Sequence, residues 1–116
     1  MDSRPLMTMF DTPDGYDKDR WTTFLDDLDA AKAREAVLMA SKQADYGPGA
    51  IMRAPGGPAF GVLVRLHDKV ERLRTLLEAG GDPNVGDEAV RDTAMDIANY
   101  GTILGMVLDG QWPEPS

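Results

Sequence analysis

The chain contains no cysteine and only one histidine, His67. The absence of cysteine excludes disulfide bonds, thiolate metal sites and cysteine nucleophiles. A single histidine argues against a zinc site built from several imidazoles. The chemistry of a functional site therefore has to come from carboxylates, amides, basic side chains and aromatic rings.

Long apolar runs and basic residues are also scarce. No segment approaches the roughly 18 apolar residues that span a bilayer, and the acidic, proline-interrupted N-terminus does not resemble a secretory signal. Twelve basic residues stand against twenty acidic ones, which gives a net charge of −8. Because non-specific nucleic-acid binding needs a basic surface, we expect a cytoplasmic protein that binds neither membranes nor nucleic acids directly.

Helical periodicity is present over most of the 116 residues. Apolar side chains recur at spacings of three and four in three long stretches, and no alternating strand pattern of useful length occurs. The sequence predicts an all-α fold, a small bundle of three long helices with a Gly/Pro-rich loop between the first two. The expected helices span residues 17–43, 60–79 and 86–109, and the loop spans residues 47–58.

The apolar stripes of these helices are expected to be buried in the bundle. The second helix has the stripe Leu63, Leu66, Val70, Leu73 and Leu77, and the third has Val90, Ala94, Ile97, Gly101, Leu104 and Leu108. On the first helix Glu35 shares the stripe with Leu28 and Leu38. It is interpreted either as part of a polar site with Lys42 or as a residue at the edge of the stripe.

The domain boundaries follow from this pattern. Residues 1–17 predict an acidic, loosely ordered arm, part of which docks on the bundle or on a partner chain. Residues 18–110 form the bundle and residues 111–116 a tail, in which Trp112 packs or folds back over a pocket. A turn is predicted at 82–84. Because three helices bury little core on their own, we expect a homo-oligomer.

Two charged stripes are candidates for a site. On the third helix, Glu88, Asp92, Asp96 and Asn99 share one face, and like charges there oppose helix formation. They form either an oxygen-ligand site for Mg²⁺ or a solvated acidic face. On the second helix, the basic residues Arg65, Lys69 and Arg72 lie beside Asp68 and Glu71. They either bind phosphate, with the two acids as metal ligands, or pair with Asp92 and Asp96 across a helix interface.

Three local patterns together resemble the nucleotide-modification-associated domain family of phage and bacterial proteins. They are residues 42–47 (KQADYG), 65–73 (RLHDKVERL) and 92–100 (DTAMDIANY), and the resemblance covers about residues 35–107. It implies a role in phage nucleotide metabolism, in the host cytoplasm if the protein is encoded by a phage. More distantly, the arrangement is similar to the MazG-like all-α nucleoside triphosphate pyrophosphohydrolases, which are oligomeric helical bundles that use Mg²⁺.

The distant resemblance implies a site in which Mg²⁺ activates water to release pyrophosphate. The metal ligands would be Asp68, Glu71, Asp92 and Asp96, with Glu71 and Asp96 as the catalytic pair. The nucleotide and its phosphates would be bound by Lys42, Asp45, Tyr46, Arg65, Lys69, Arg72, Asn99 and Tyr100. One departure is evident, because this chain has Thr93 where the MazG-like pattern has a glutamate three residues before Asp96.

Three functions follow as hypotheses. The first is a nucleotide-binding protein that, if active, is a Mg²⁺-dependent nucleoside triphosphate pyrophosphohydrolase. The second is a non-catalytic nucleotide binder or sponge, whose binding would not depend on Mg²⁺. The third is a protein-interaction module that uses the acidic arm to contact a basic partner.

Overall fold

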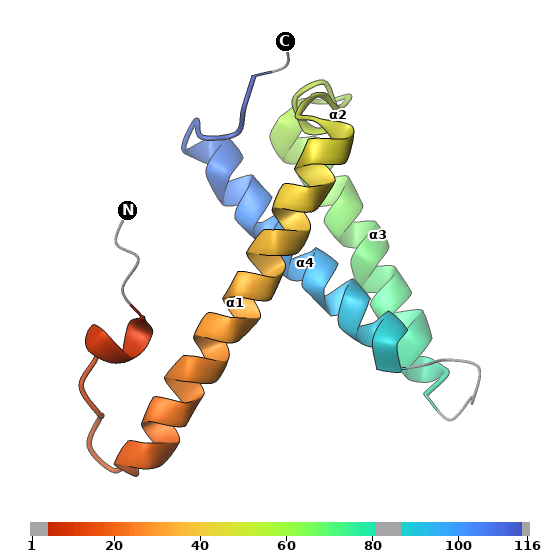
Figure 1. Cartoon of the computed structure of the whole chain (residues 1–116). Coiled ribbons are helices and arrows are strands. Elements are labelled where there is room, and N and C mark those ends of the chain that lie inside the picture. The colour runs from red at the N-terminus through yellow and green to blue at the C-terminus, as the bar shows by residue number, and fades with distance from the viewer. Residues whose placement is uncertain (1–4, 81–86, 115–116) are drawn as a thin grey trace. The chain divides into compact units, whose positions relative to one another are not determined.

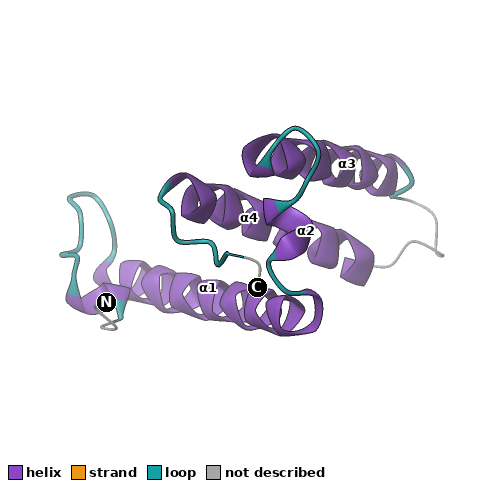
Figure 2. Ribbon diagram, turned by 90° about the horizontal axis from the view of Figure 1, so that it is seen from above, coloured by secondary structure: helices purple, strands orange, loops and turns teal. Residues whose placement is uncertain are grey.

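The structure is a computed structural model that describes residues 5–80 and 87–114. Over these residues it contains helices, turns and loops but no strand (Figure 2), which confirms the all-α fold. The three long helices are α1 (Lys18–Tyr46), α3 (Pro58–Glu78) and α4 (Asp87–Leu108), and two short ones are η1 (Leu6–Thr8) and α2 (Gly49–Met52). None of the helices described is long and apolar enough to cross a membrane. The turn predicted at 82–84 lies outside the described residues.

Two compact units make up the chain, Met1–Leu38 and Met39–Ser116, and the boundary between them lies inside α1. In the first unit, the carboxylate of Asp17 accepts a hydrogen bond from the Arg20 backbone N–H at 3.0 Å. This bond caps the start of α1, close to the residue where the predicted helix begins. The Leu6 backbone N–H donates to the Asp29 carboxylate at 3.0 Å, so η1 is tied to α1.

The second unit contains the end of α1 together with α2, α3 and α4 (Figure 1). The chain runs along α3 and returns along α4, and these two helices pack against each other. Their buried apolar residues, with those of α2 and the C-terminal segment, are Ile51, Val62, Ile103 and Trp112. Trp112 is 8% exposed, so the C-terminal segment folds back onto the core as expected.

The end of α1 is set by glycine and proline. Gly47 has φ +69°, a left-handed conformation that ends a helix without strain for glycine. Its N–H donates to the Gln43 carbonyl at 2.8 Å, which closes the last turn of α1. The helix therefore ends at Tyr46, three residues beyond the predicted end, and the predicted loop contains the four-residue helix α2.

The predicted buried stripe of α3 is wrong in part. Leu63, Val70 and Leu77 are 56%, 49% and 60% exposed, whereas the neighbouring Val62 is completely buried. Of the elements described, α3 packs mainly against α4 and α2, so one side of its apolar surface is covered and the other is not. Similarly, Leu108 at the end of the predicted α4 stripe is 71% exposed, while Thr93 and Asn99 on α4 are buried.

Candidate functional site

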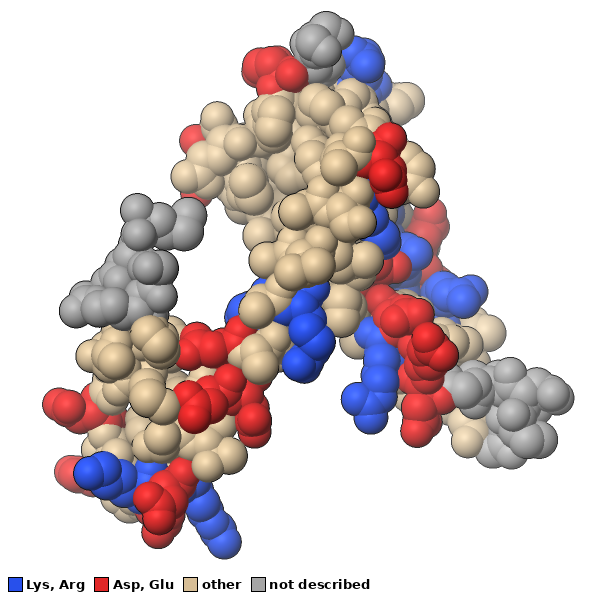
Figure 3. Space-filling model, in the orientation of Figure 1, with Lys and Arg blue, Asp and Glu red and all other residues tan. Residues whose placement is uncertain are grey.

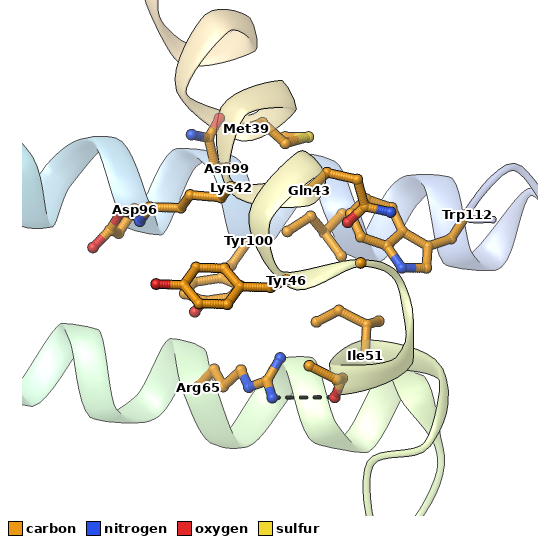
Figure 4. Close-up of a pocket in the computed structure, with 13 residues that line it drawn as sticks. Met39, Lys42, Gln43, Tyr46, Ile51, Arg65, Asp96, Asn99, Tyr100 and Trp112 are labelled. Carbon is orange, nitrogen blue, oxygen red and sulfur yellow. Dashed lines mark hydrogen bonds and ion pairs between the residues drawn. The ribbon is translucent and has the colours of Figure 1, made fainter. Parts of the chain in front are cut away.

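A cavity of about 410 Å³ lies in the second unit, between the end of α1, α2, α3, α4 and the C-terminal segment. Six residues of its lining were predicted from sequence to bind a nucleotide or metal: Lys42, Tyr46, Arg65, Asp96, Asn99 and Tyr100. Figure 4 shows these side chains reaching in from α1, α3 and α4. The volume is in the range of pockets that hold small organic molecules.

A pair of lysines holds one carboxylate at this cavity. The Lys42 ammonium at the end of α1 lies 2.9 Å from Oδ1 of Asp96, and the Lys69 ammonium of α3 lies 3.1 Å from Oδ2. Asp96 is 16% exposed, so α1, α3 and α4 are joined through one largely buried carboxylate. This confirms, for Lys69 and Asp96, the prediction that the basic stripe of α3 pairs with the acidic face of α4.

These contacts change the proton affinities of both partners. The hydrogen bond to Asp96 raises the pKa of the Lys42 ammonium above its ordinary value, and partial burial opposes this less strongly. For Asp96, partial burial favours the protonated form, but the hydrogen bonds from Lys42 and Lys69 outweigh it together. The pKa of Asp96 therefore lies below its ordinary value. Both shifts favour the charged forms, so the ion pair between Lys42 and Asp96 is kept at neutral pH.

Arg65 adds a third positive charge to the site. One guanidinium nitrogen donates to the Ala50 carbonyl at 3.1 Å, which orients the side chain along the cavity wall (Figure 4). A guanidinium has five N–H donors, so this single bond uses only part of its capacity. Lys42 and Arg65 thus line a cavity whose one acidic lining residue, Asp96, is also paired with Lys69, in a chain whose net charge is −8.

Aromatic and polar side chains form the rest of the wall. Tyr46 and Tyr100 both line the cavity, and Tyr46 is 77% exposed. Asn99 is a buried amide in the same wall. The buried indole N–H of Trp112 has no hydrogen-bond partner among the residues described. A buried donor without a partner is costly.

Several predicted site residues lie elsewhere. Asp45 and Arg72 are exposed and do not line the cavity, and Lys69 adjoins it only through Asp96. Glu71 pairs with Arg74 at 3.6 Å along α3. Glu35 pairs with Lys32 at 3.2 Å within the first unit, and the ion-pair partner of Lys42 is Asp96.

The carboxylates expected to hold Mg²⁺ do not assemble into a metal site. Asp68, Glu71 and Asp92 are exposed, and both oxygens of Asp96 face lysines. Thr93, at the position of the missing glutamate, is buried and donates its hydroxyl to the Ala89 carbonyl at 2.8 Å. In the described part of the chain, no three Asp, Glu or His side chains are grouped to hold a metal ion. This donor set fits an anion better than Mg²⁺.

Sequence reasoning missed part of the lining. Met39, Ile51 and Ile103 are uncharged and lie in none of the three patterns, and Gln43 lies in the pattern at residues 42–47 but was given no role. Gln43 and Met39 lie one turn apart on α1, on the side that also presents Lys42 and Tyr46. A helical projection of residues 39–46 from Lys42 would have found both of them.

Comparisons with protein-family models, with curated proteins and with solved structures found no match to this chain.

Proposed function

We propose that the second unit binds an anionic aromatic small molecule of the nucleotide type, without a metal ion and without hydrolysing it. The observation that carries this proposal is the lysine pair on Asp96, in the wall of a cavity that also contains two tyrosines and an arginine. This is the second of the three hypotheses from sequence.

The cationic wall supports binding of the phosphate. Asp96 neutralises only part of the positive charge of Lys42, Lys69 and Arg65, so an additional anion is favoured there. Lys42 is 52% exposed on its side chain and can turn from the carboxylate to a ligand while Lys69 still pairs with Asp96. A phosphate that carries more charge than a carboxylate would compete for it effectively.

The tyrosines support binding of the base. A base stacked on the ring of Tyr46 or Tyr100 would bury apolar surface and gain about 0.5–1.5 kcal/mol from offset stacking. The exposed ring of Tyr46 has most to gain, because binding would cover a large apolar surface now in contact with water. The Asn99 amide in the cavity wall adds a polar group that would hydrogen-bond to the edge of a base.

Calorimetry with mono-, di- and triphosphate nucleotides tests the proposal, with each titration repeated in a chelator. We expect binding that survives chelation, and a Lys42→Ala variant that binds about 10- to 100-fold more weakly, as loss of a charged hydrogen bond predicts. The matched control is Lys32→Ala, which removes a lysine of the same helix that pairs with Glu35 outside the cavity. Lys32→Ala should bind like the wild type.

An Asp96→Asn variant separates anion binding from metal-dependent hydrolysis. Removing the negative charge of Asp96 frees Lys42 for the ligand, so we expect nucleotide binding to tighten roughly 10-fold. Binding that requires Mg²⁺, release of pyrophosphate, and loss of both in Asp96→Asn would overturn the proposal in favour of a hydrolase. Absence of binding by every nucleotide would overturn it in favour of the protein-interaction hypothesis.

A further inference from the structure

The charge of the cavity lining limits the charge of its ligand. Lys42, Arg65 and Asp96 are the charged side chains among the described residues that line the cavity, so the lining carries one net positive charge. Lys69 adds a second positive charge outside the lining, but its ammonium lies 3.1 Å from Oδ2 of Asp96. A phosphate monoester carries a charge of about −1.5 to −2 at neutral pH, and every further phosphate of a nucleotide adds to it. One phosphate therefore matches this lining better than three.

The two cations of the lining do not form a continuous track. Lys42 comes from the end of α1 and Arg65 from α3, and in Figure 4 the rings of Tyr46 and Tyr100 lie between them. Arg65 donates to the Ala50 carbonyl at 3.1 Å, which ties it to α2. The consecutive phosphates of a di- or triphosphate need several positive groups close together. A single phosphate needs only one of these positions.

Exposed acids stand next to the cations of the site. Asp92 lies one turn before Asp96 on α4, and Asp68 directly precedes Lys69 on α3. Figure 3 shows acidic side chains interspersed with basic ones along α3. A phosphate chain that extends from Lys42 into solvent would leave the positive part of the lining and approach carboxylates. The repulsion there would weaken the binding of di- and triphosphates.

A divalent cation would offset the charge of a polyphosphate, but the site offers it few ligands. Mg²⁺ is commonly bound by one or two carboxylates together with phosphate oxygens. Asp96, the one carboxylate in the described lining, has Oδ1 2.9 Å from the Lys42 ammonium and Oδ2 3.1 Å from the Lys69 ammonium. No group of three Asp, Glu or His side chains in the described residues could hold a metal ion. A second or third phosphate would therefore stay largely uncompensated.

Another side of the cavity is apolar and suits a base. Ile51, Ile103 and Trp112 belong both to the lining and to the buried core of the second unit. Figure 4 shows Ile51 and Trp112 on the side away from Lys42 and Asp96. The volume of about 410 Å³ is near the lower end of the range for small-molecule pockets. A small ligand with one charged end and one flat, apolar end fits this division.

We propose, on the basis of the function proposed above, that the ligand of this cavity is a nucleoside monophosphate and that di- and triphosphates bind more weakly. The single phosphate is bound by Lys42, and the base lies toward the apolar side. The discrimination comes from charge. One phosphate meets the positive lining, whereas each added phosphate meets the acids outside it.

Calorimetric titration of the full chain in a chelator tests this preference. The probes are the mono-, di- and triphosphates of the four common ribonucleosides, together with the unphosphorylated nucleosides. For the base that binds best, we expect the monophosphate to bind most tightly, with a loss of about 3- to 10-fold for each added phosphate. A di- or triphosphate that binds as tightly as the monophosphate would overturn the inference and leave the proposed function intact. Absence of binding by every nucleotide, or a nucleoside that binds as tightly as its monophosphate, would overturn both.

An Asp92→Asn variant tests whether charge causes the preference. Removing this exposed carboxylate weakens the repulsion of a second phosphate, so the ratio of monophosphate to diphosphate affinity should fall by about 2- to 3-fold. The matched control Asp109→Asn removes the same charge just beyond the C-terminal end of α4 and should keep the wild-type ratio. Added salt should also lower the ratio in the wild type, since it screens exposed charges. A ratio that neither Asp92→Asn nor salt changes would overturn the proposal.

Discussion

At the scale of single residues, Asp96 has the greatest influence on the site. It is largely buried and accepts hydrogen bonds from lysines on two other helices. Its short contacts fix where the end of α1 lies against α3 and α4 in the second unit. The same carboxylate also occupies the cations that a ligand would need. Asp96 thus links the stability of the unit to the affinity of the site.

The lowered pKa of Asp96 predicts how stability depends on pH. Because its pKa is lower in the folded state than in the unfolded chain, its contribution is complete above the unfolded value of about 3.9 and is lost as the pH falls through the lower folded value. Melting temperatures measured from neutral pH to about pH 2 should therefore decline more steeply for the wild type than for Asp96→Asn. Parallel declines would show that the ion pairs contribute nothing to stability.

The charged and aromatic residues of the site could be predicted, and the function of the acids could not. The spacing of Arg65 and Asp96 on their helices, and the resemblance at Tyr46 and Tyr100, indicated residues that do line the cavity. Spacing along one helix does not tell which charge an acid meets on the next helix. For that reason the sequence could suggest Asp96 as a metal ligand, whereas only the three-dimensional structure shows that two lysines contact it.

At the scale of helices, Gly61 sets how closely α3 approaches the segment after α2. A Cβ atom at Gly61 would lie well inside van der Waals contact with the Cβ of Ala54. We expect Gly61→Ala to lower the free energy of unfolding by about 1–3 kcal/mol through overpacking, despite alanine's higher helix propensity.

Gly101 provides the opposite case on α4. A Cβ atom there meets no other described atom within 4 Å, so Gly101→Ala should raise the free energy of unfolding by about 0.5–1 kcal/mol. Urea denaturation followed by circular dichroism measures both variants. Equal effects of the two substitutions would contradict the close approach at Gly61.

The ends of the helices were easier to predict than their buried sides. Asp17 and Gly47 act through bonds within a few residues, so their sequence positions located the start of α1 and, within three residues, its end. The short helix α2 lacks such a signal because it lies among glycines and prolines. The exposure of Leu63 and Val70 could not be predicted either, since periodicity identifies an apolar side but not how many neighbours cover it.

At the scale of the whole chain, charge is distributed unevenly. The net charge of −8 disfavours anionic ligands at long range, whereas Lys42 and Arg65 line the cavity and Lys69 pairs with Asp96, the one acid of the lining. The local arrangement governs binding at contact distance, and the net charge governs the approach of the ligand. Raising the ionic strength screens both the distant repulsion and the exposed part of the contacts. Global composition alone therefore did not indicate a cationic site.

The two tryptophans are divided between the two compact units, with Trp21 in the first and Trp112 in the second. Each unit consequently carries its own fluorophore. In a Trp21→Phe variant all indole emission comes from Trp112, whose ring lines the cavity and whose N–H is buried. We expect its emission to shift when a ligand enters and again when the second unit unfolds. The Trp21→Phe variant reports the melting of the second unit, and a Trp112→Phe variant reports that of the first. Comparing the two melting temperatures would reveal whether the chain melts in one transition or in two.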